Sequence, residues 1–236
     1  MKKVGFSTGC LYKTSIKIKE IIKLYNSIGA NAIEISFGSL HELSKFNLTQ
    51  EIIQDVKKYD FVSLHAPWDI RYGDNKKTQK IITKLEYLFK NLNAEGIVLH
   101  PDTIDSFPFL EKLSLPFLLE NMDPRKKFGT HPDFFEKLKK GYEFKFVLDL
   151  FHAYENDFSM NSSRDFLKVM GNDLNHFHVS GIFGNNRHAL TYSADNKESI
   201  VEIINLRKNV PIISEGNISN NIEQTILEEL DFLKNV

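Results

Sequence analysis

The feature that most constrains the fold is a repeated alternation of short apolar segments with amphipathic ones along the 236 residues. The apolar segments have the length of buried strands, and the segments between them have the apolar spacing of helices. The predicted strands are residues 4–7, 32–36, 61–65, 96–100, 116–120, 144–149, 174–179 and 212–215. Strands that alternate with helices in this way predict a parallel sheet.

The predicted helices complete eight strand–helix units. They are residues 15–28, 49–59, 77–92, 104–112, 132–140, 163–170, 197–208 and 222–233. Thr49 is the predicted cap of the second helix, and Gly29 is the predicted end of the first. The fold class is therefore predicted to be α/β, as a single (β/α)8 TIM barrel in one domain over residues 1–236. An open doubly wound sheet is the alternative, but no glycine-rich phosphate turn follows the first strand.

Composition limits the classes of partner and compartment. The net charge of −1 provides no overall positive field for nucleic acid, although a local basic cleft would not show in the total. Cys10 is the only cysteine, which excludes an intramolecular disulfide and favours a reducing compartment. No apolar segment is long enough for a signal sequence or a membrane span. A cytoplasmic protein with no membrane partner is therefore predicted. The sequence indicates no obligate protein partner.

Residue types that bind metals stand at the ends of six of the eight predicted strands. In a (β/α)8 barrel the carboxyl ends of all strands meet at one face, so these side chains are expected to converge. They are His65, His100, Glu120, Asp149, His152, His176, His178 and Glu215, with His188 in the loop after the seventh strand. Imidazoles and carboxylates without thiolates suit zinc, manganese or magnesium.

Each of these residues alone has an ordinary structural explanation. A histidine at a strand end is most often a hydrogen-bonded turn residue, and an aspartate such as Asp149 is often a helix cap. A buried glutamate is different, because it is costly without a cation or a partner. Glu120 and Glu215 therefore favour the metal interpretation most strongly.

Seven short motifs occur in order along the chain. They are Leu-His-Ala-Pro-Trp at 64–68, Leu-His-Pro at 99–101, Leu-Leu-Glu-Asn at 118–121, Leu-Asp-Leu-Phe-His-Ala at 148–153, His-Val-Ser-Gly at 178–181, Asn-Arg-His at 186–188 and Ile-Ser-Glu at 213–215. With this ordered set, the chain resembles the xylose isomerase-like TIM barrel superfamily. Within it, the chain is similar to the endonuclease IV group, AP endonuclease family 2.

The resemblance implies a multinuclear centre of two or three divalent metal ions, most readily zinc, with manganese or magnesium as alternatives. The first ion would be held by Glu120, Asp149, His178 and Glu215. The second would be held by His65 and His100, with Glu120 as a bridge. The third would be held by His152 and His188. The pair His65 and His100 favours the hydrolases of the superfamily, because its sugar isomerases and epimerases usually use only the first site.

Three departures from the endonuclease pattern affect this expectation. Asn186 stands where the third site would have an aspartate, which makes that site a weaker one. Gly181 replaces an aspartate that usually follows the seventh strand. Residues 122–125, Met-Asp-Pro-Arg, replace a Thr-Ala-Gly turn.

The first predicted function is an endonuclease IV-like phosphodiester hydrolase, acting in DNA repair on abasic-site DNA or on a related phosphoester. The metals would generate the attacking hydroxide, and Glu120 and Glu215 are the predicted catalytic carboxylates. Trp68 and Arg187 are the predicted substrate-binding residues. The basic residues 125–127 could also contact phosphates, although a solvated charge run explains them equally well.

Two alternatives remain open. A sugar or sugar-phosphate isomerase or epimerase would use one metal, with Glu120 and Glu215 as bases. The near-neutral charge and the loop 37–40, which has none of the residues that such endonucleases use to enter DNA, favour a small substrate. The other alternative is a metal-binding barrel without turnover. The predicted partner is therefore a small-molecule phosphoester or sugar, or damaged DNA.

Overall fold

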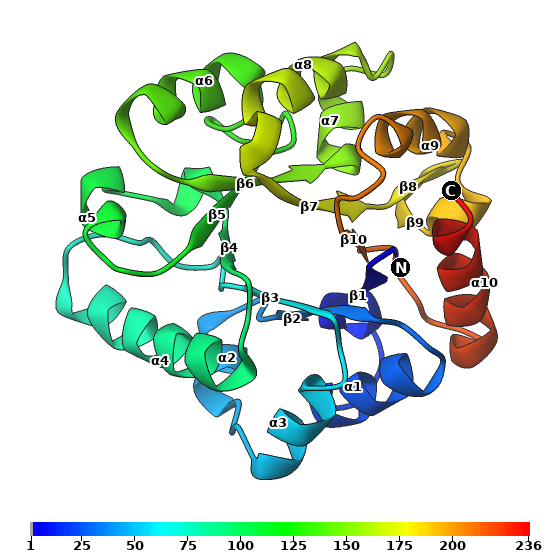
Figure 1. Ribbon diagram of the computed structural model, residues 1–236, viewed down its shortest axis with the longest axis horizontal. Coiled ribbons are helices and arrows are strands. Elements are labelled where there is room, and N and C mark those ends of the chain that lie inside the picture. The colour runs from blue at the N-terminus through cyan, green and yellow to red at the C-terminus, as the bar shows by residue number, and fades with distance from the viewer. Residues whose placement is uncertain (1) are drawn as a thin grey trace.

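The computed structural model describes residues 2–236 and contains a closed barrel of eight parallel strands (Figure 1). The strands are β1 (Val4–Ser7), β2 (Ala32–Ser36), β3 (Phe61–His65), β4 (Ile97–Leu99), β5 (Phe117–Glu120), β6 (Lys145–Asp149), β7 (Leu174–Val179) and β10 (Ile212–Ser214). Around the ring their order is β1-β10-β7-β6-β5-β4-β3-β2. The predicted (β/α)8 barrel is confirmed.

The helices surround the barrel, as Figure 1 shows. They are α1 (Ile18–Ser27), α2 (Leu40–Lys45), α3 (Gln50–Val56), α4 (Lys76–Leu92), α5 (Phe107–Glu111), α6 (Pro132–Gly141), α7 (Leu150–Asn156), α8 (Asn161–Met170), α9 (Lys197–Asn205) and α10 (Ile222–Lys234). The predicted caps are present: the side chain of Thr49 accepts from the Ile52 amide, and Gly29 follows α1 with a φ of 87°.

Three elements differ from the sequence prediction. The segment after β6 was predicted as a loop but forms α7, because the side chain of Asp149 caps its first turn. α2 was not predicted, since the predicted loop after the second strand covers residues 37–40, and Ser39 caps this helix in the same way. The loop after β7 contains an antiparallel hairpin of β8 (Gly181–Phe183) and β9 (Asn186–Ala189), which turns at Gly184 with a φ of 55°.

The strands divide their side chains between two layers. One set packs outward under the helices in the main hydrophobic core, which includes Ile33, Leu64 and Leu119. The alternate positions form separate small apolar clusters: Ala32, Phe61 and Ile213, and Val98, Leu118 and Val147. Because side chains alternate along a strand, residues two or four positions further on share the inner face with these clusters. Those positions include Glu34, His65, His100, Glu120, Asp149 and Glu215.

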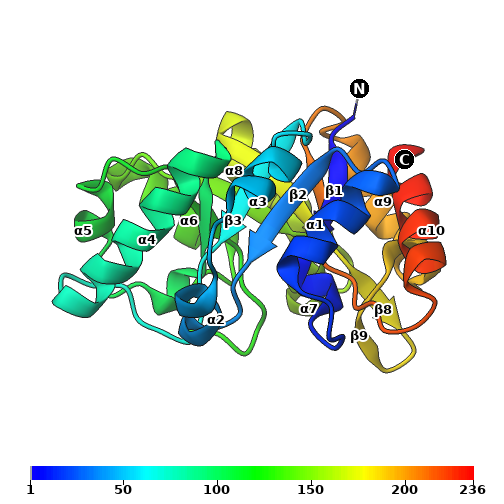
Figure 2. The same ribbon diagram turned by 90° about the horizontal axis from the view of Figure 1, so that it is seen from below.

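The strands run downward in Figure 2, so their carboxyl ends lie at the lower edge with α2, α7 and the β8–β9 hairpin. This edge is the rim at which barrels of this architecture place their sites. Among residues 2–236, no helix combines the length and the apolar character that crossing a membrane would require.

Candidate metal centre

The Glu120 carboxylate, at the end of β5, is the centre of the polar cluster at the rim. Its Oε2 atom lies 3.2 Å from Nε2 of His65 and 3.3 Å from Nε2 of His100. Its Oε1 atom lies 3.3 Å from Nδ1 of His152 and 3.5 Å from Nδ1 of His178. Burial alone would raise the pKa of Glu120, but His178 and His100 outweigh it and hold that pKa well below its usual range. The two oxygens thus face two different sets of imidazoles.

Asp149 uses its two carboxylate oxygens for different purposes. Oδ1 accepts from the His152 amide at 2.7 Å and so caps α7. The Asn121 side chain fixes the backbone at this point, because it accepts from the Asp149 amide and donates to the Asp149 carbonyl. Oδ2 is buried and has no hydrogen-bond partner among the described residues. A rigid backbone therefore presents one free carboxylate oxygen to the cluster.

His65 and His100 face Glu120 from the ends of β3 and β4. Nδ1 of His65 donates to the Ala66 carbonyl at 3.0 Å, so the neutral ring has its lone pair on Nε2, the atom beside Glu120. The two imidazole rings meet edge to face, with their centroids 4.9 Å apart. Burial lowers the pKa of His100 and keeps its ring neutral. Burial opposes the protonation of His65, but the hydrogen bond to Glu120 outweighs burial and raises the pKa of His65, so a metal ion would have to displace a proton from this ring.

Glu215 follows β10 and completes the other side of the cluster. Its Oε2 atom lies 3.6 Å from Nδ1 of His178, and its side chain is 20% exposed, so it faces the mouth of the barrel. Burial raises the pKa of Glu215 to about 7, and the carboxylates of Glu120 and Asp149 add to this shift although His178 opposes it. Glu215 is thus a carboxyl group that exchanges protons near neutral pH.

Two groups of potential ligands at the rim share Glu120. One consists of His65, His100 and Glu120, and the other of Glu120, Asp149, His178 and Glu215; within each group the ligand atoms lie within 4.8 Å of one another. Oδ2 of Asp149 and Nδ1 of His178 are buried without a hydrogen-bond partner in the described part of the chain. Buried polar atoms are normally satisfied. The donor set and these orphaned atoms therefore fit divalent metal ions with nitrogen and oxygen ligands.

The titration of these ligands predicts how metal affinity depends on pH. Glu215, with its pKa of about 7, takes up a proton as the pH falls, and a metal ion must displace that proton. We therefore expect zinc affinity to rise by at least about tenfold between pH 6 and pH 8. Competition with a chromogenic chelator at several pH values measures this rise. Glu215→Gln should bind more weakly and lose part of the pH dependence, whereas a constant affinity in the wild type would contradict the prediction.

The ligands predicted for the third metal site do not lie close together, unlike those of the other two sites. The rings of His152 and His188 lie 6.3 Å apart, and Nδ1 of His152 donates to the Asn121 carbonyl at 2.9 Å. His188 lies in β9, where its Nδ1 is 3.2 Å from Oγ of Ser180. In residues 2–236, neither histidine belongs to a ligand group of three or more, and Asn186 is exposed. A third metal stays a prediction.

His152 instead lies against the carboxylates of the first two groups. Burial opposes its protonation, but Asp149 and Glu120 outweigh burial and raise the pKa of His152 to about 10. The ring is therefore cationic at neutral pH in the metal-free protein. Its charge compensates part of the negative charge of the carboxylate cluster.

Trp68 and Arg187 border the site on different sides. Trp68 is 44% exposed and stacks on His100, with centroids 5.7 Å apart and an angle of 12° between the rings. Arg187 forms an ion pair with Glu155 and lies over the Phe151 ring at 5.5 Å. Trp68 thus gives the mouth of the barrel an aromatic wall.

Two other cations of the rim, Arg125 and Lys126, are also paired. Arg125 contacts both oxygens of Asp123, at 2.6 and 3.0 Å, and Lys126 lies 2.8 Å from Asp102. With its own partner engaged, each cation offers less charge to a phosphate. Arg125 and Asp123 lie two residues apart in one loop, whereas the pair of Lys126 with Asp102 joins loops after different strands and could not be read from the sequence.

The absence of a side chain at Gly181 has a steric explanation. A Cβ atom there would lie 2.3 Å from Cβ of Ala194 and 2.7 Å from Oδ1 of Asn196. An aspartate, as the endonuclease pattern has at this position, does not fit beside the 194–196 segment. The departure noted in the sequence is therefore tied to the way the chain packs after the hairpin.

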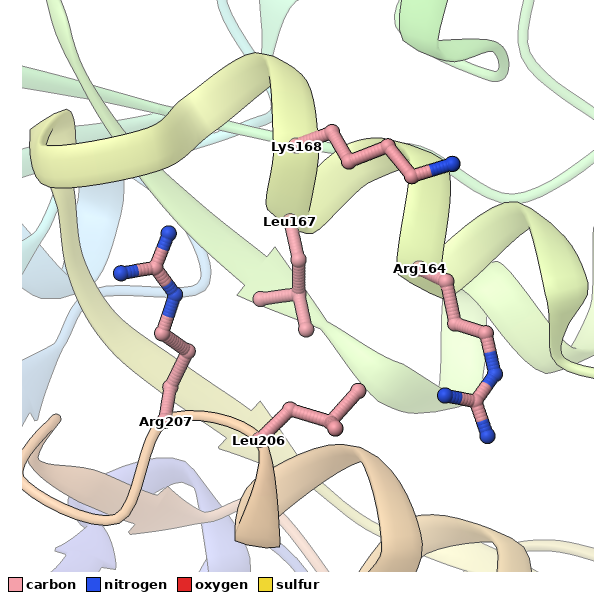
Figure 3. Close-up of a pocket in the computed structure, with 5 residues that line it drawn as sticks. All are labelled: Arg164, Leu167, Lys168, Leu206 and Arg207. Atoms are coloured by element: carbon pink, nitrogen blue, oxygen red, sulfur yellow. The ribbon is translucent and has the colours of Figure 1, made fainter.

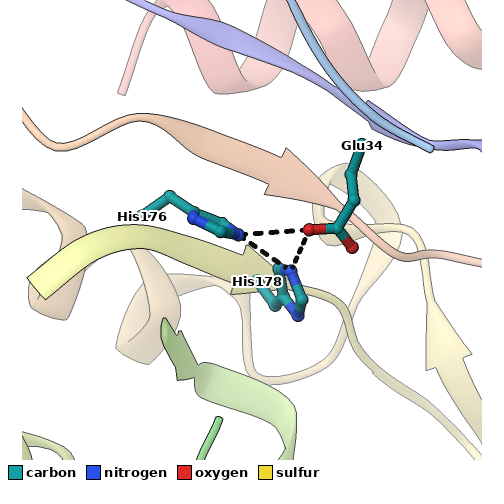
Figure 4. Close-up of side chains that lie close together, drawn as sticks. All are labelled: Glu34, His176 and His178. Atoms are coloured by element: carbon teal, nitrogen blue, oxygen red, sulfur yellow. Dashed lines mark hydrogen bonds and ion pairs between the residues drawn. The ribbon is translucent and has the colours of Figure 1, made fainter. Parts of the chain in front are cut away.

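A further polar cluster, which sequence analysis did not identify, lies inside the barrel. Glu34 on β2 contacts His176 and His178 on β7, and all three side chains are fully buried (Figure 4). The available signal was a single carboxylate in the otherwise apolar strand Ala32–Ser36. His178 joins this cluster to the metal centre, because its two ring nitrogens face the two clusters.

A shallow groove of about 330 Å³ lies on the outside of the barrel, between α8 and the segment after α9 (Figure 3). It is lined by Arg164, Leu167, Lys168, Leu206 and Arg207. These residues lie near the starts of β7 and β10, at the end of the barrel opposite the metal ligands. The groove is therefore separate from the candidate metal centre.

No protein-family model and no curated protein sequence matches the chain. Solved structures match over nearly its whole length. A 3-keto-D-glucoside 4-epimerase from E. coli has a TM-score of 0.73 at 16% identity, with all of both chains covered. Endonuclease IV from Thermus thermophilus has a TM-score of 0.73 at 15% identity, with 99% of both chains covered.

A D-tagatose 3-epimerase-like protein has a TM-score of 0.69 at 17% identity, with 99% of this chain and 98% of that chain covered. The matches span the xylose isomerase-like TIM barrel superfamily, and they include both an endonuclease and sugar epimerases. At these identities, the likeness concerns the fold. The resemblance that the sequence motifs indicate is therefore confirmed at the level of the fold, which the chain shares with these structures.

Proposed function

We propose that the protein is a dinuclear metal-dependent hydrolase of phosphoesters, similar in its ligand arrangement to endonuclease IV. The observation that supports this most directly is the position of Glu120, whose Oε2 faces His65 and His100 while Oε1 faces His178. A carboxylate with one oxygen in each of two ligand groups is suited to bridge two ions. The histidine-rich group favours zinc over magnesium.

In this proposal, His65, His100 and Glu120 hold one ion, and Glu120, Asp149, His178 and Glu215 hold the other. Two ions held in this way would supply Lewis-acid polarisation of a phosphoester and would offset the charge that develops on its oxygens. The chain's own residues orient the substrate: Trp68 provides an aromatic surface beside His100 and His65. Glu215, with a pKa of about 7 in the metal-free protein, is a candidate proton carrier at the mouth.

A sugar isomerase or epimerase is the second candidate, and the ion pairs of the rim favour it. Arg125, Lys126 and Arg187 each contact a carboxylate, which leaves less positive charge for a DNA backbone. A polar sugar does not need that charge. Glu120 and Glu215, in one ligand group, would then exchange the proton between substrate carbons.

Metal content distinguishes the two candidates. For the hydrolase, we expect two zinc ions per chain after purification without chelator, and one ion after His65→Ala or His100→Ala. The reason is that these variants remove ligands of only one group. Elemental analysis measures the content, and His41→Ala, at an exposed histidine of α2, is the matched control. Incision of an abasic-site oligonucleotide should fall in the two site variants and not in the control.

A single ion that is indifferent to both substitutions would overturn the hydrolase. In that case, epimerisation of free ketoses, followed by chromatography of the products, tests the second candidate. Metal uptake with neither activity would support a binding barrel without turnover.

A further inference from the structure

Glu34, His176 and His178 form a triangle of polar atoms inside the barrel (Figure 4). Oε2 of Glu34 lies 3.3 Å from Nε2 of His176 and 3.2 Å from Nε2 of His178. The two Nε2 atoms are 3.1 Å apart. All three side chains are fully buried.

The hydrogen bonds around the triangle determine where its proton lies. The side-chain oxygen of Asn175 can only accept, so Nδ1 of His176, at 2.8 Å, donates to it. A neutral His176 then has a lone pair on Nε2, inside the triangle. Glu34 Oε2 is also an acceptor, and it already receives a hydrogen bond from Oγ of Ser63 at 2.9 Å. The remaining corner, Nε2 of His178, is the donor that both acceptors require.

We propose that Glu34 and His176 are positioning residues that keep the proton of His178 on Nε2, so that Nδ1 offers its lone pair to a metal ion. This inference rests on the metal centre of the proposed function. Nδ1 of His178 lies 3.6 Å from Glu215 and has no hydrogen-bond partner among residues 2–236, as a ligand atom would in the absence of its ion. Histidine ligands commonly donate their second N–H to a carboxylate in this way.

The surroundings of His178 explain why residues that fix its proton position are needed. Carboxylates lie on both sides of the ring: Glu34 beside Nε2, and Glu120 and Glu215 beside Nδ1. In the neutral ring, which is the form that binds a metal ion, the one remaining proton can go to either nitrogen. If it moved to Nδ1, it would occupy the position of the metal. Two acceptors beside Nε2 bias the proton away from the metal side.

Glu34→Gln tests this bias, because it keeps the shape and replaces the carboxylate by an amide that can donate to Nε2. We expect zinc affinity to fall by about 10- to 100-fold, as for other outer partners of metal-bound histidines. In metal-free protein with labelled histidine, nitrogen NMR at a pH where the ring is neutral should show the His178 proton on Nε2 in the wild type and on Nδ1 in the variant. His178→Gln identifies the signal.

Two further variants separate positioning from folding. Ser63→Ala removes a hydrogen bond to the same oxygen of Glu34 but leaves the carboxylate, and should bind zinc nearly as the wild type does. Glu34→Asp retains the charge, and should keep the proton on Nε2 even if Glu34→Gln does not fold. Thermal melts of the metal-free proteins report folding separately from zinc binding.

Three results would overturn the inference. They are a His178 proton on Nδ1 in the wild type, unchanged zinc affinity in Glu34→Gln, and an additional zinc ion that His176→Gln removes, since a metal would then occupy the triangle. The readouts are zinc binding and proton position, not turnover. A wild type that binds zinc without hydrolysing phosphoesters would contradict the proposed function and leave this inference intact.

Discussion

Replacing Glu120 by glutamine is expected to abolish tight metal binding by both ligand groups, and the activity with it. One oxygen of this carboxylate faces His65 and His100, and the other faces His178. An amide cannot provide two anionic oxygens to two ions. The affinity for zinc should fall further than it does when an outer partner of a metal ligand is replaced, which typically costs about 10- to 100-fold. Isothermal titration with zinc and elemental analysis of the purified variant measure it.

The matched control is Glu111→Gln, which makes the same chemical change at an exposed glutamate of α5. It should bind metal as the wild type does. Zinc should also raise the melting temperature of the wild type and of the control, but not of Glu120→Gln, because a ligand stabilises a protein only when it binds the native state. Retention of two ions by Glu120→Gln would show that Glu120 is not the bridge.

Much of the candidate site could be predicted because the barrel relates strand ends to one another by rule. His65, Glu120 and Asp149 each end an apolar run, and a closed parallel sheet brings such ends to one rim. No long-range contact had to be known. The predicted end of this strand at Asp149 is correct, but the sequence prediction missed that the same residue also caps α7.

The features that sequence analysis missed depend on contacts between distant segments. Glu34 meets His176 only because β2 and β7 place these side chains on the same inner surface of the barrel. Arg187 is engaged by Glu155, which lies 32 residues away on α7, an element that the sequence did not predict. Charge pairs across loops have no periodicity, so the sequence gives no signal for them.

The balance between the two candidate functions depends on these unpredicted pairs. A phosphodiester in DNA approaches the rim with its charged backbone, and would have to compete with Asp123 for Arg125 and with Glu155 for Arg187. A neutral sugar approaches without that competition, and Trp68 suits its apolar face. The ligand geometry around Glu120 favours a dinuclear hydrolase, whereas the rim favours a small substrate. A small phosphoester satisfies both.

The largest expected effect on stability comes from a glutamate outside the metal centre. Glu229 on α10 is fully buried and accepts hydrogen bonds from the Thr191 and Tyr192 amides, at 3.1 and 3.0 Å, and from Oγ of Ser214 at 2.8 Å. Glu229→Ala would leave three donors without this acceptor, two of them buried and one partly buried. Since each costs roughly 1–3 kcal/mol, we expect the free energy of unfolding to fall by about 3–5 kcal/mol. Urea denaturation of the metal-free protein measures this loss.

The intermediate substitution Glu229→Gln makes the argument specific to hydrogen bonding. Its amide oxygen can still accept from Thr191 and Ser214, but its NH₂ group would face the Tyr192 amide, so about 1–3 kcal/mol should be lost. Glu228→Ala, at the exposed neighbour on the same helix, should cost less than about 0.5 kcal/mol. Because Ser214 directly precedes Glu215, Glu229→Ala should also weaken zinc binding. Equal stabilities of the alanine and glutamine variants would show that the volume of the side chain, and not its acceptors, holds the end of β10 in place.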